Sequence, residues 1–184
     1  LPLRHLEYAA NLNNCYISAY GFGAAITNAT TFAMMDRLGI AQYLSRIGLL
    51  IDGNTGESLK AAQQSWMEDP VWQPLRKHCE DSFVVQDWFE LFVAQNLVTD
   101  GLLYPLVYGR FAGELSQTGG AVVSMLTEFM DEWYAESVKW VDAFVKTAAA
   151  ESPENKHLLS QWVRDGIAST TEALTPLAKL MYLE

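Results

Sequence analysis

The chain has three histidines, His5, His78 and His157, and their neighbours limit the metal chemistry open to it. A carboxylate-bridged pair of iron ions in a helical bundle needs a Glu-x-x-His motif on each of two helices, because that spacing puts carboxylate and imidazole on one helical face. Only Glu154 and His157 have this spacing. They fall in the first turn of an expected helix, where an acidic residue suits the positive end of the helix dipole. We interpret the pair as a solvated helix start.

Other catalytic patterns do not occur in the sequence. It contains neither a G-x-S-x-G nucleophile motif nor a G-x-x-x-x-G-K-[ST] phosphate loop, and the glycines around Phe22 lack the strand that a dinucleotide-binding loop follows. Cys15 and Cys79 are far apart and are interpreted as thiols in a reducing compartment, not as a disulfide or a zinc site. We therefore predict no catalytic and no cofactor-binding residue in this chain.

The amino-acid composition indicates which class of partner, whether protein, nucleic acid or membrane, the chain is suited to contact. Half of the 184 residues are apolar, 12% are aromatic, including six Trp, and only 18% are charged, which favours a large interface with another protein. A net charge of −10 without a basic run excludes nucleic acid. The sequence shows no stretch long enough to span a bilayer and no signal peptide at its start, so we expect no membrane association and a cytoplasmic location.

Helical periodicity dominates the chain, and no convincing strand alternation occurs. The stripe of Ile40, Leu44, Ile47 and Ile51 has the spacing of a core face. Turn residues, prolines and apolar stripes predict helices over residues 3–19, 24–51, 58–68, 74–83, 87–114, 121–150 and 153–173.

Three helices in this set carry further expectations. Gly101 and Pro105 should kink the helix over 87–114 or divide it in two. Ser152 should cap the last helix with Pro153 at its first position, and Pro176 should interrupt it. The helix over 121–150 should present one apolar face made of Val122, Met125, Phe129, Trp133, Trp140 and Phe144. Long helices with short connections predict an all-α bundle.

One segment, residues 29–42, reads A-T-T-F-A-M-M-D-R-L-G-I-A-Q. It resembles the stretch A-T-F-G-M-M-D-E-L-R-H-G-Q of the iron-binding subunit of bacterial multicomponent monooxygenases, in which the Glu and the His three residues later hold iron. Arg37 and Ile40 stand at these two places. A guanidinium has no lone pair for a metal, and isoleucine has no ligand atom. The resemblance thus points to an oxygenase complex and to a subunit that lacks its own metal site.

The resemblance implies three more vestigial ligand positions. Glu7, in an E-Y-A-A segment, matches the first helix of the iron-binding subunit, and residues 131–135 stand where that subunit has D-E-x-R-H, so that Glu132 keeps the carboxylate and Ala135 takes the histidine position. The alternative for Glu7 and Glu132 is a surface or salt-bridged acid. We hypothesise that Arg37 is buried and bridges to Glu7 or Glu132 in place of iron; the alternative is an exposed helix arginine.

Further segments, residues 4–14, 40–46 and 90–96 with 101–106, extend the likeness over nearly the whole chain. Together they resemble the β (small oxygenase, or L) subunit of bacterial multicomponent phenol hydroxylases and toluene monooxygenases, with methane monooxygenase β subunits as near relatives. That subunit is substantially longer, so we expect residues 1–184 to be a single helical domain cut from a longer chain.

The resemblance implies a ferritin-like bundle, similar to the small subunit of ribonucleotide reductase, without metal. It further implies an iron-bearing α subunit and a small γ subunit as partners in an (αβγ)2 hydroxylase. The α subunit would hold the di-iron centre and hydroxylate aromatic rings with O2, with NADH-derived electrons delivered by a reductase and assistance from a regulatory protein. The expected contact regions are residues 27–31 and the segments around Trp66, Trp72 and Trp88.

Two alternatives remain open at this point. The chain could be a metal-loaded di-iron oxidase or oxygenase bundle in its own right, or an unrelated helical protein-interaction domain. The substrate of the complex, whether phenol, toluene or an alkane, does not follow from this sequence.

Overall fold

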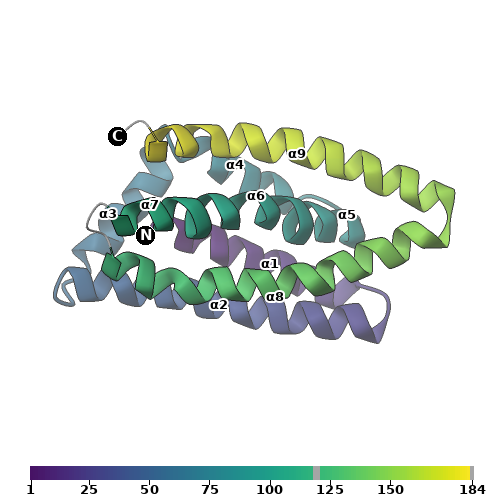
Figure 1. Cartoon of the computed structure of the whole chain (residues 1–184), viewed down its shortest axis with the longest axis horizontal. Coiled ribbons are helices and arrows are strands. Elements are labelled where there is room, and N and C mark those ends of the chain that lie inside the picture. Colours follow the sequence, from purple (N-terminus) through teal and green to yellow (C-terminus); the bar gives the residue numbers. More distant parts are fainter. Residues whose placement is uncertain (118–120, 183–184) are drawn as a thin grey trace. The chain divides into compact units, whose positions relative to one another are not determined.

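A computed structural model describes residues 1–117 and 121–182, and every regular element in these two ranges is a helix. The chain divides into two compact units, Leu1–Phe92 and Val93–Glu184. The first unit contains α1 (Leu3–Tyr20), α2 (Ala24–Ile51), α3 (Glu57–Glu68), α4 (Gln73–Ser82) and α5 (Trp88–Phe92), seen in purple to blue-green in Figure 1. None of the helices in the described ranges is long and apolar enough to cross a membrane.

The antiparallel pair α1 and α2 forms the centre of the first unit. A row of buried residues on α2 recurs in alternating steps of four and three residues, which is the seven-residue period of a helix that packs lengthwise against another helix. Ala9 and Ala10 on α1 are buried and let the two backbones approach closely. Ile51 was predicted to join this row, but it is the last residue of α2 and is 66% exposed. The buried row is Ile26, Thr30, Ala33, Arg37, Ile40, Leu44 and Ile47.

Two turns fix where these helices end. The Gly21 N–H donates to the carbonyl of Ile17 at 2.7 Å, and a Cβ on Gly21 would lie 2.5 Å from that same oxygen, so a larger residue would have to shift the turn. After α2, the Asp52 carboxylate accepts hydrogen bonds from the backbone N–H groups of Ser58 at 2.8 Å and Thr55 at 3.1 Å. These bonds lower the pKa of Asp52 and tie α3 to the end of α2.

The second unit contains η1 (Val93–Thr99) and η2 (Pro105–Phe111), both π-helical, with α6 (Asp100–Tyr104), α7 (Ala112–Gln117), α8 (Ala121–Glu151) and α9 (Pro153–Tyr182). The helical backbone continues through Pro105 but changes there from the α-helix α6 to the π-helix η2, and the predicted kink stays a prediction. Pro105 opens η2 in helical conformation, with φ −61° and ψ −35°. Proline has no N–H and so cannot make the i→i−4 hydrogen bond of an α-helix. At Pro105 the hydrogen-bonding pattern changes to that of a π-helix, so the missing donor falls where the α-helical pattern has already ended.

The hairpin of α8 and α9, green to yellow in Figure 1, confirms the predicted cap between the two helices. The Ser152 hydroxyl accepts a hydrogen bond from the Asn155 N–H at 3.0 Å. The predicted interruption at Pro176 is wrong, because α9 continues to Tyr182. Buried residues on both sides of Pro176 keep one face of the helix packed and offset the cost of about 3 kcal/mol of an internal proline. They are Thr170, Ala173, Leu174 and Leu177.

The predicted apolar face of α8 also needs correction. Val122, Met125 and Phe129 are 69%, 75% and 38% exposed. The buried row of α8 instead contains Met130 and Val141, which are three full turns apart and share a face. The predicted stripe therefore lies one residue away from the side that packs within this chain.

Candidate functional site

The candidate site lies in the first unit, on the facing sides of α1 and α2. Three side-chain bonds fix the register of this helix pair. Asn11 Nδ2 donates to the Met34 carbonyl at 2.7 Å, and the Ser18 hydroxyl contacts the Thr31 hydroxyl at 2.6 Å and donates to the Thr27 carbonyl at 3.2 Å. This register brings Glu7 on α1 level with Arg37 on α2.

Glu7 and Arg37 form a buried ion pair. Arg37 Nε lies 3.2 Å from Glu7 Oε2, and both side chains are 0% exposed. Among the described residues, Arg37 is the largest fully buried side chain. A buried guanidinium is tolerated only when an opposite charge compensates it. The hypothesis that Arg37 is buried and bridges to a carboxylate is confirmed, and the carboxylate is Glu7.

Cys79 on α4 lies close enough to this ion pair to respond to both charges. Burial raises the pKa of the Cys79 thiol to about 12, with Arg37 lowering it and Glu7 raising it. At neutral pH the thiol stays protonated, so it is neither a nucleophile nor a ready metal ligand. The interpretation of Cys79 as a buried free thiol is confirmed. No sequence motif predicts that this thiol lies near Arg37, although the spacing of Leu75 and Cys79 places both on the buried face of α4.

The other vestigial positions differ in their surroundings. Ile40 is 3% exposed and lies one turn beyond Arg37 on the buried side of α2, so an apolar side chain fills the place predicted for a histidine. Glu132 and Ala135 belong to α8 in the second unit, and both are exposed. The assignment of all five residues as former ligand positions stays a prediction.

The only Glu-x-x-His motif lies at the surface. Glu154 and His157 are exposed in the first turns of α9, which confirms the interpretation as a solvated helix start. Within residues 1–117 and 121–182, no three side chains among His, Cys, Asp and Glu come together in a group that could hold a metal ion. The side chains around Glu7 therefore do not fit a di-iron centre, and we assign no chemical step to one in this chain.

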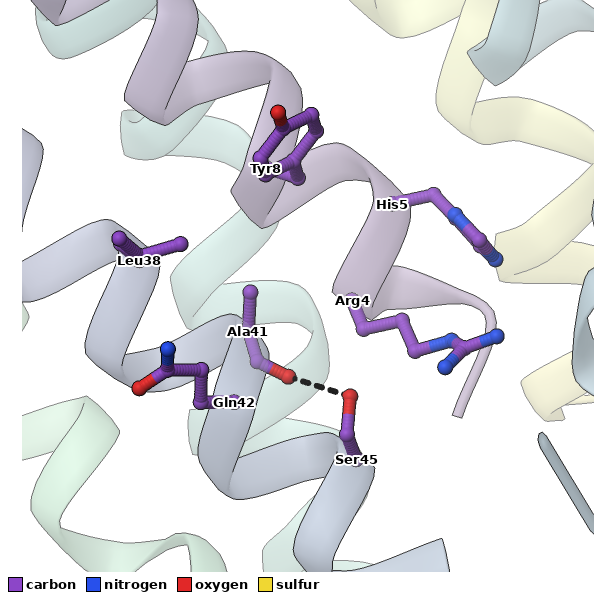
Figure 2. Close-up of a pocket in the computed structure, with 7 residues that line it drawn as sticks. All are labelled: Arg4, His5, Tyr8, Leu38, Ala41, Gln42 and Ser45. Carbon is purple, nitrogen blue, oxygen red and sulfur yellow. Dashed lines mark hydrogen bonds between the residues drawn. The ribbon is translucent and has the colours of Figure 1, made fainter. Parts of the chain in front are cut away.

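An open depression of about 260 Å³ lies between α1 and α2 and is lined by the residues shown in Figure 2. Its α1 side carries His5, whose ring stacks on Trp66 at 5.6 Å, and burial together with the charge of Arg4 lowers the pKa of His5 to about 4. His5 is therefore neutral at pH 7. Arg4 donates from Nη2 to the Leu59 carbonyl at 3.0 Å. The remaining lining residues are Tyr8, Leu38, Ala41, Gln42 and Ser45, and they supply no acid, base or nucleophile pair.

Two of the predicted contact regions contain buried side chains. Trp66 and Trp72 are 7% and 9% exposed, with ring centroids 6.2 Å apart, so they pack in the core of the first unit instead of at its surface. In residues 27–31, Thr30 is fully buried and donates to the Ile26 carbonyl, and the hydroxyl of Thr31 bonds within the helix pair. Asn28 in the same stretch is exposed, and Met67 beside Trp66 is 47% exposed. The assignment of these regions as contacts with another subunit stays a prediction.

Residues 1–152 match the sequence profile of the family described as methane/phenol/alkene hydroxylase. The chain belongs to this hydroxylase family. This membership confirms the predicted resemblance, and it excludes the alternative of an unrelated helical domain.

Several relatives of this hydroxylase chain are subunits of oxygenases. It is 52% identical over 179 residues to the phenol 2-monooxygenase oxygenase component DmpL of Pseudomonas sp. (strain CF600), covering 97% of this chain and 54% of that relative. It is 50% identical to the oxygenase component MhpL of Acinetobacter pittii (strain PHEA-2), and again covers 97% of this chain and 54% of the relative. The chain thus spans about half the length of these relatives.

Solved structures agree on the fold. Phenol hydroxylase from Pseudomonas sp. OX1 matches with a TM-score of 0.95 and 47% identity, over 97% of this chain and 55% of that one. Toluene 4-monooxygenase matches with a TM-score of 0.87 at 21% identity, over 98% of this chain and 60% of that one, which supports the fold alone. The predicted ferritin-like helical fold is confirmed by these matches.

Proposed function

We propose that this chain is part of the non-catalytic β subunit of a multicomponent phenol or toluene monooxygenase. The β subunit would scaffold the hydroxylase, and another subunit would carry out the oxidation. We further propose that residues 1–184 are one domain of a longer chain, which is supported by their covering about half of each relative.

The ion pair between Glu7 and Arg37 is the observation that carries this proposal. Its two members face each other on α1 and α2, with Ile40 buried one turn away from Arg37. The resemblance implies that all three residues stand at former ligand positions. A guanidinium neutralises Glu7 and links the two helices as a metal would, but it offers no site for O2. Such a core keeps the two helices linked but cannot carry out metal-dependent oxidation.

The partners follow from the resemblance. The proposed complex joins this subunit to an iron-bearing α subunit with the di-iron centre and to a small γ subunit, in an (αβγ)2 assembly. A reductase would supply electrons from NADH and a regulatory protein would act on the complex. Because NADH is a cytoplasmic reductant, and because Cys15 and Cys79 are free thiols, we propose a cytoplasmic location.

The remaining alternative is a metal-loaded bundle in this chain itself. It would require a carboxylate and histidine group, and the residues around Glu7 instead provide Arg37, Ile40 and a thiol whose pKa is raised to about 12. No observation on the described residues supports that alternative.

Reconstitution tests the proposed function. The purified α and γ subunits, reductase and regulatory protein are assayed for NADH-dependent phenol hydroxylation with and without the full-length subunit that contains this chain. We expect product formation only when the subunit is present, and restoration by adding it back. Turnover of phenol by this subunit with reductase alone, or full activity of the other components in its absence, would contradict the proposal.

A further inference from the structure

Four aromatic rings of the second unit form one contiguous cluster around Tyr104 of α6. The ring centroid of Tyr104 lies 5.1 Å from that of Tyr108 on η2. On α8, the ring centroids of Trp133 and Tyr134 lie 5.4 Å and 5.2 Å from it. We call these four residues the tyrosine–tryptophan cluster. Tyr104 is fully buried, whereas Trp133 and Tyr134 are partly exposed, so the cluster connects the core of the second unit with its surface.

The members of this cluster share a chemical property besides their packing. Phenol and indole are the aromatic side chains that lose a single electron most readily, and rings in contact pass an electron between them. Tyr104 touches the other three rings, so an electron lost from Trp133 can be replaced from Tyr134 through Tyr104. Ring contacts alone also suit a hydrophobic core. A tyrosine that stays oxidised needs more, because its phenol must give up a proton together with the electron.

A buried carboxylate lies close to the phenol of Tyr134. The phenol oxygen is 3.5 Å from the place that a Cβ would take on Gly101, so it rests against the start of α6. The preceding residue, Asp100, is 3% exposed, and its Oδ1 accepts a hydrogen bond from Gln95 Nε2 at 3.0 Å. Burial raises the pKa of Tyr134, and the charges of Asp100 and Asp142 raise it further. The carboxylate of Asp100 therefore stands where it can receive the phenolic proton.

A second tyrosine pair, in the first unit, provides the contrast. The rings of Tyr16 and Tyr20 on α1 are 4.6 Å apart between centroids, closer than any pair in the cluster. The Tyr16 hydroxyl donates to the carbonyl of Gln86 at 2.9 Å, and a carbonyl does not take up a proton at neutral pH. Tyr20 is 66% exposed. Ring contact thus occurs in both places, and the tyrosine–tryptophan cluster adds to it a buried carboxylate.

We propose that Tyr134 is a redox-active tyrosine, which collects one-electron oxidations from the tyrosine–tryptophan cluster and holds them at the surface of the second unit. A one-electron oxidant of the sulfate-radical class takes an electron from Trp133 and becomes sulfate. Trp133 regains an electron from Tyr134 through Tyr104, the O–H bond of Tyr134 breaks, and the proton passes to the carboxylate of Asp100. The products are a neutral tyrosyl radical at Tyr134 and a protonated Asp100. A dissolved thiol then returns a hydrogen atom to Tyr134 and becomes a thiyl radical, and Asp100 releases its proton to water. This inference goes beyond the proposed function and does not depend on it.

Spin trapping on the full-length subunit tests this inference. Tris(bipyridine)ruthenium(II) and persulfate generate sulfate radicals in a brief light flash, a nitrone spin trap captures protein radicals, and mass spectrometry of peptides locates the adducts. We expect more adduct on Tyr134 than on Tyr20, although Tyr20 is 66% exposed and meets the oxidant more easily. In Asp100→Asn the adduct on Tyr134 should be lost, because an amide cannot take the proton. In Tyr104→Phe, which keeps the ring, oxidation products should move from Tyr134 to Trp133.

Tyr20→Phe is the matched control, because it removes the phenol of a stacked and exposed tyrosine outside the cluster, and it should leave the adduct on Tyr134 unchanged. Circular dichroism should show the same helix content in every variant. The comparison of Tyr134 with Tyr20 needs no substitution, so it holds even if Asp100→Asn fails to fold. Adduct on Tyr134 no greater than on Tyr20 in the unchanged subunit would overturn the proposal. An adduct on Tyr134 that persists in a folded Asp100→Asn variant would overturn it as well.

Discussion

At the scale of single residues, a buried ion pair between Glu7 and Arg37 links α1 to α2. The loss of ligands follows from residue types, because neither arginine nor isoleucine can hold a metal. That a buried arginine needs a carboxylate follows from the cost of burying charge. Which carboxylate it finds depends on the register of α1 against α2, and that register is set by Asn11 and Ser18, whose partners are far away in the sequence.

Arg37→Met should destabilise the protein by about 3–5 kcal/mol, because it leaves the carboxylate of Glu7 buried without a countercharge. Replacing both partners, with Glu7→Leu and Arg37→Met together, should recover most of that loss. Urea denaturation followed by circular dichroism measures the free energy of unfolding. Arg110→Met serves as the control, since its ion pair with Glu114 is solvent-exposed and its loss should change stability by less than about 1 kcal/mol. An Arg37→Met variant as stable as the control would rule out a structural role for the pair.

His5 should make stability depend on pH. Its pKa falls from 6.5 in the free side chain to about 4 in the folded chain, so the unfolded state binds more protons between these values. The contribution of His5 to stability is therefore complete above about pH 6.5 and declines as the pH drops toward 4. The free energy of unfolding, measured by urea titration at several pH values, should vary less over this range in His5→Gln than in the unchanged protein. His157→Gln, at an exposed site on α9, should leave the pH profile as it is, and an unaltered profile in His5→Gln would refute the assignment.

At the scale of helices, local sequence signals predicted where helices start better than whether they continue through a proline. The cap at Ser152 and the turn glycines gave correct helix starts, because these residues act on neighbouring backbone groups. Pro176 was predicted by the same local rules to interrupt its helix, yet it lies inside α9. Burial of Leu174 and Leu177 around Pro176 comes from contacts between helices, which a local rule does not include.

Ser152→Ala should lower stability by about 1 kcal/mol, because the N–H of Asn155 loses its side-chain acceptor at the start of α9. Thermal and urea denaturation provide the measurement. Ser160→Ala is the comparison variant: the Ser160 hydroxyl donates to the Lys156 carbonyl within the same helix, so its removal should cost less than about 0.5 kcal/mol. Equal effects of the two substitutions would mean that Ser152 does not cap α9.

At the scale of the whole molecule, periodicity predicted a helical protein, and the resemblance supplied the ferritin-like fold. The predicted apolar stripe of α8 illustrates the limit of periodicity. Helical spacing shows that Val122, Met125 and Phe129 share a face, but it does not show whether that face packs within the chain or outside it. The low share of charged residues, 18%, agrees with the apolar side chains that the helices leave exposed, and the large interface that it favours stays a prediction.

We propose that this subunit supports a di-iron centre in its partner without holding one itself. The most direct test measures iron in the full-length subunit, alone and in a purified complex with the iron-bearing subunit, after anaerobic loading with Fe(II), re-oxidation and removal of loose metal. We predict no bound iron in this subunit alone and a pair of iron ions for each iron-bearing partner in the complex. A pair of tightly held iron ions in this subunit alone would contradict the account.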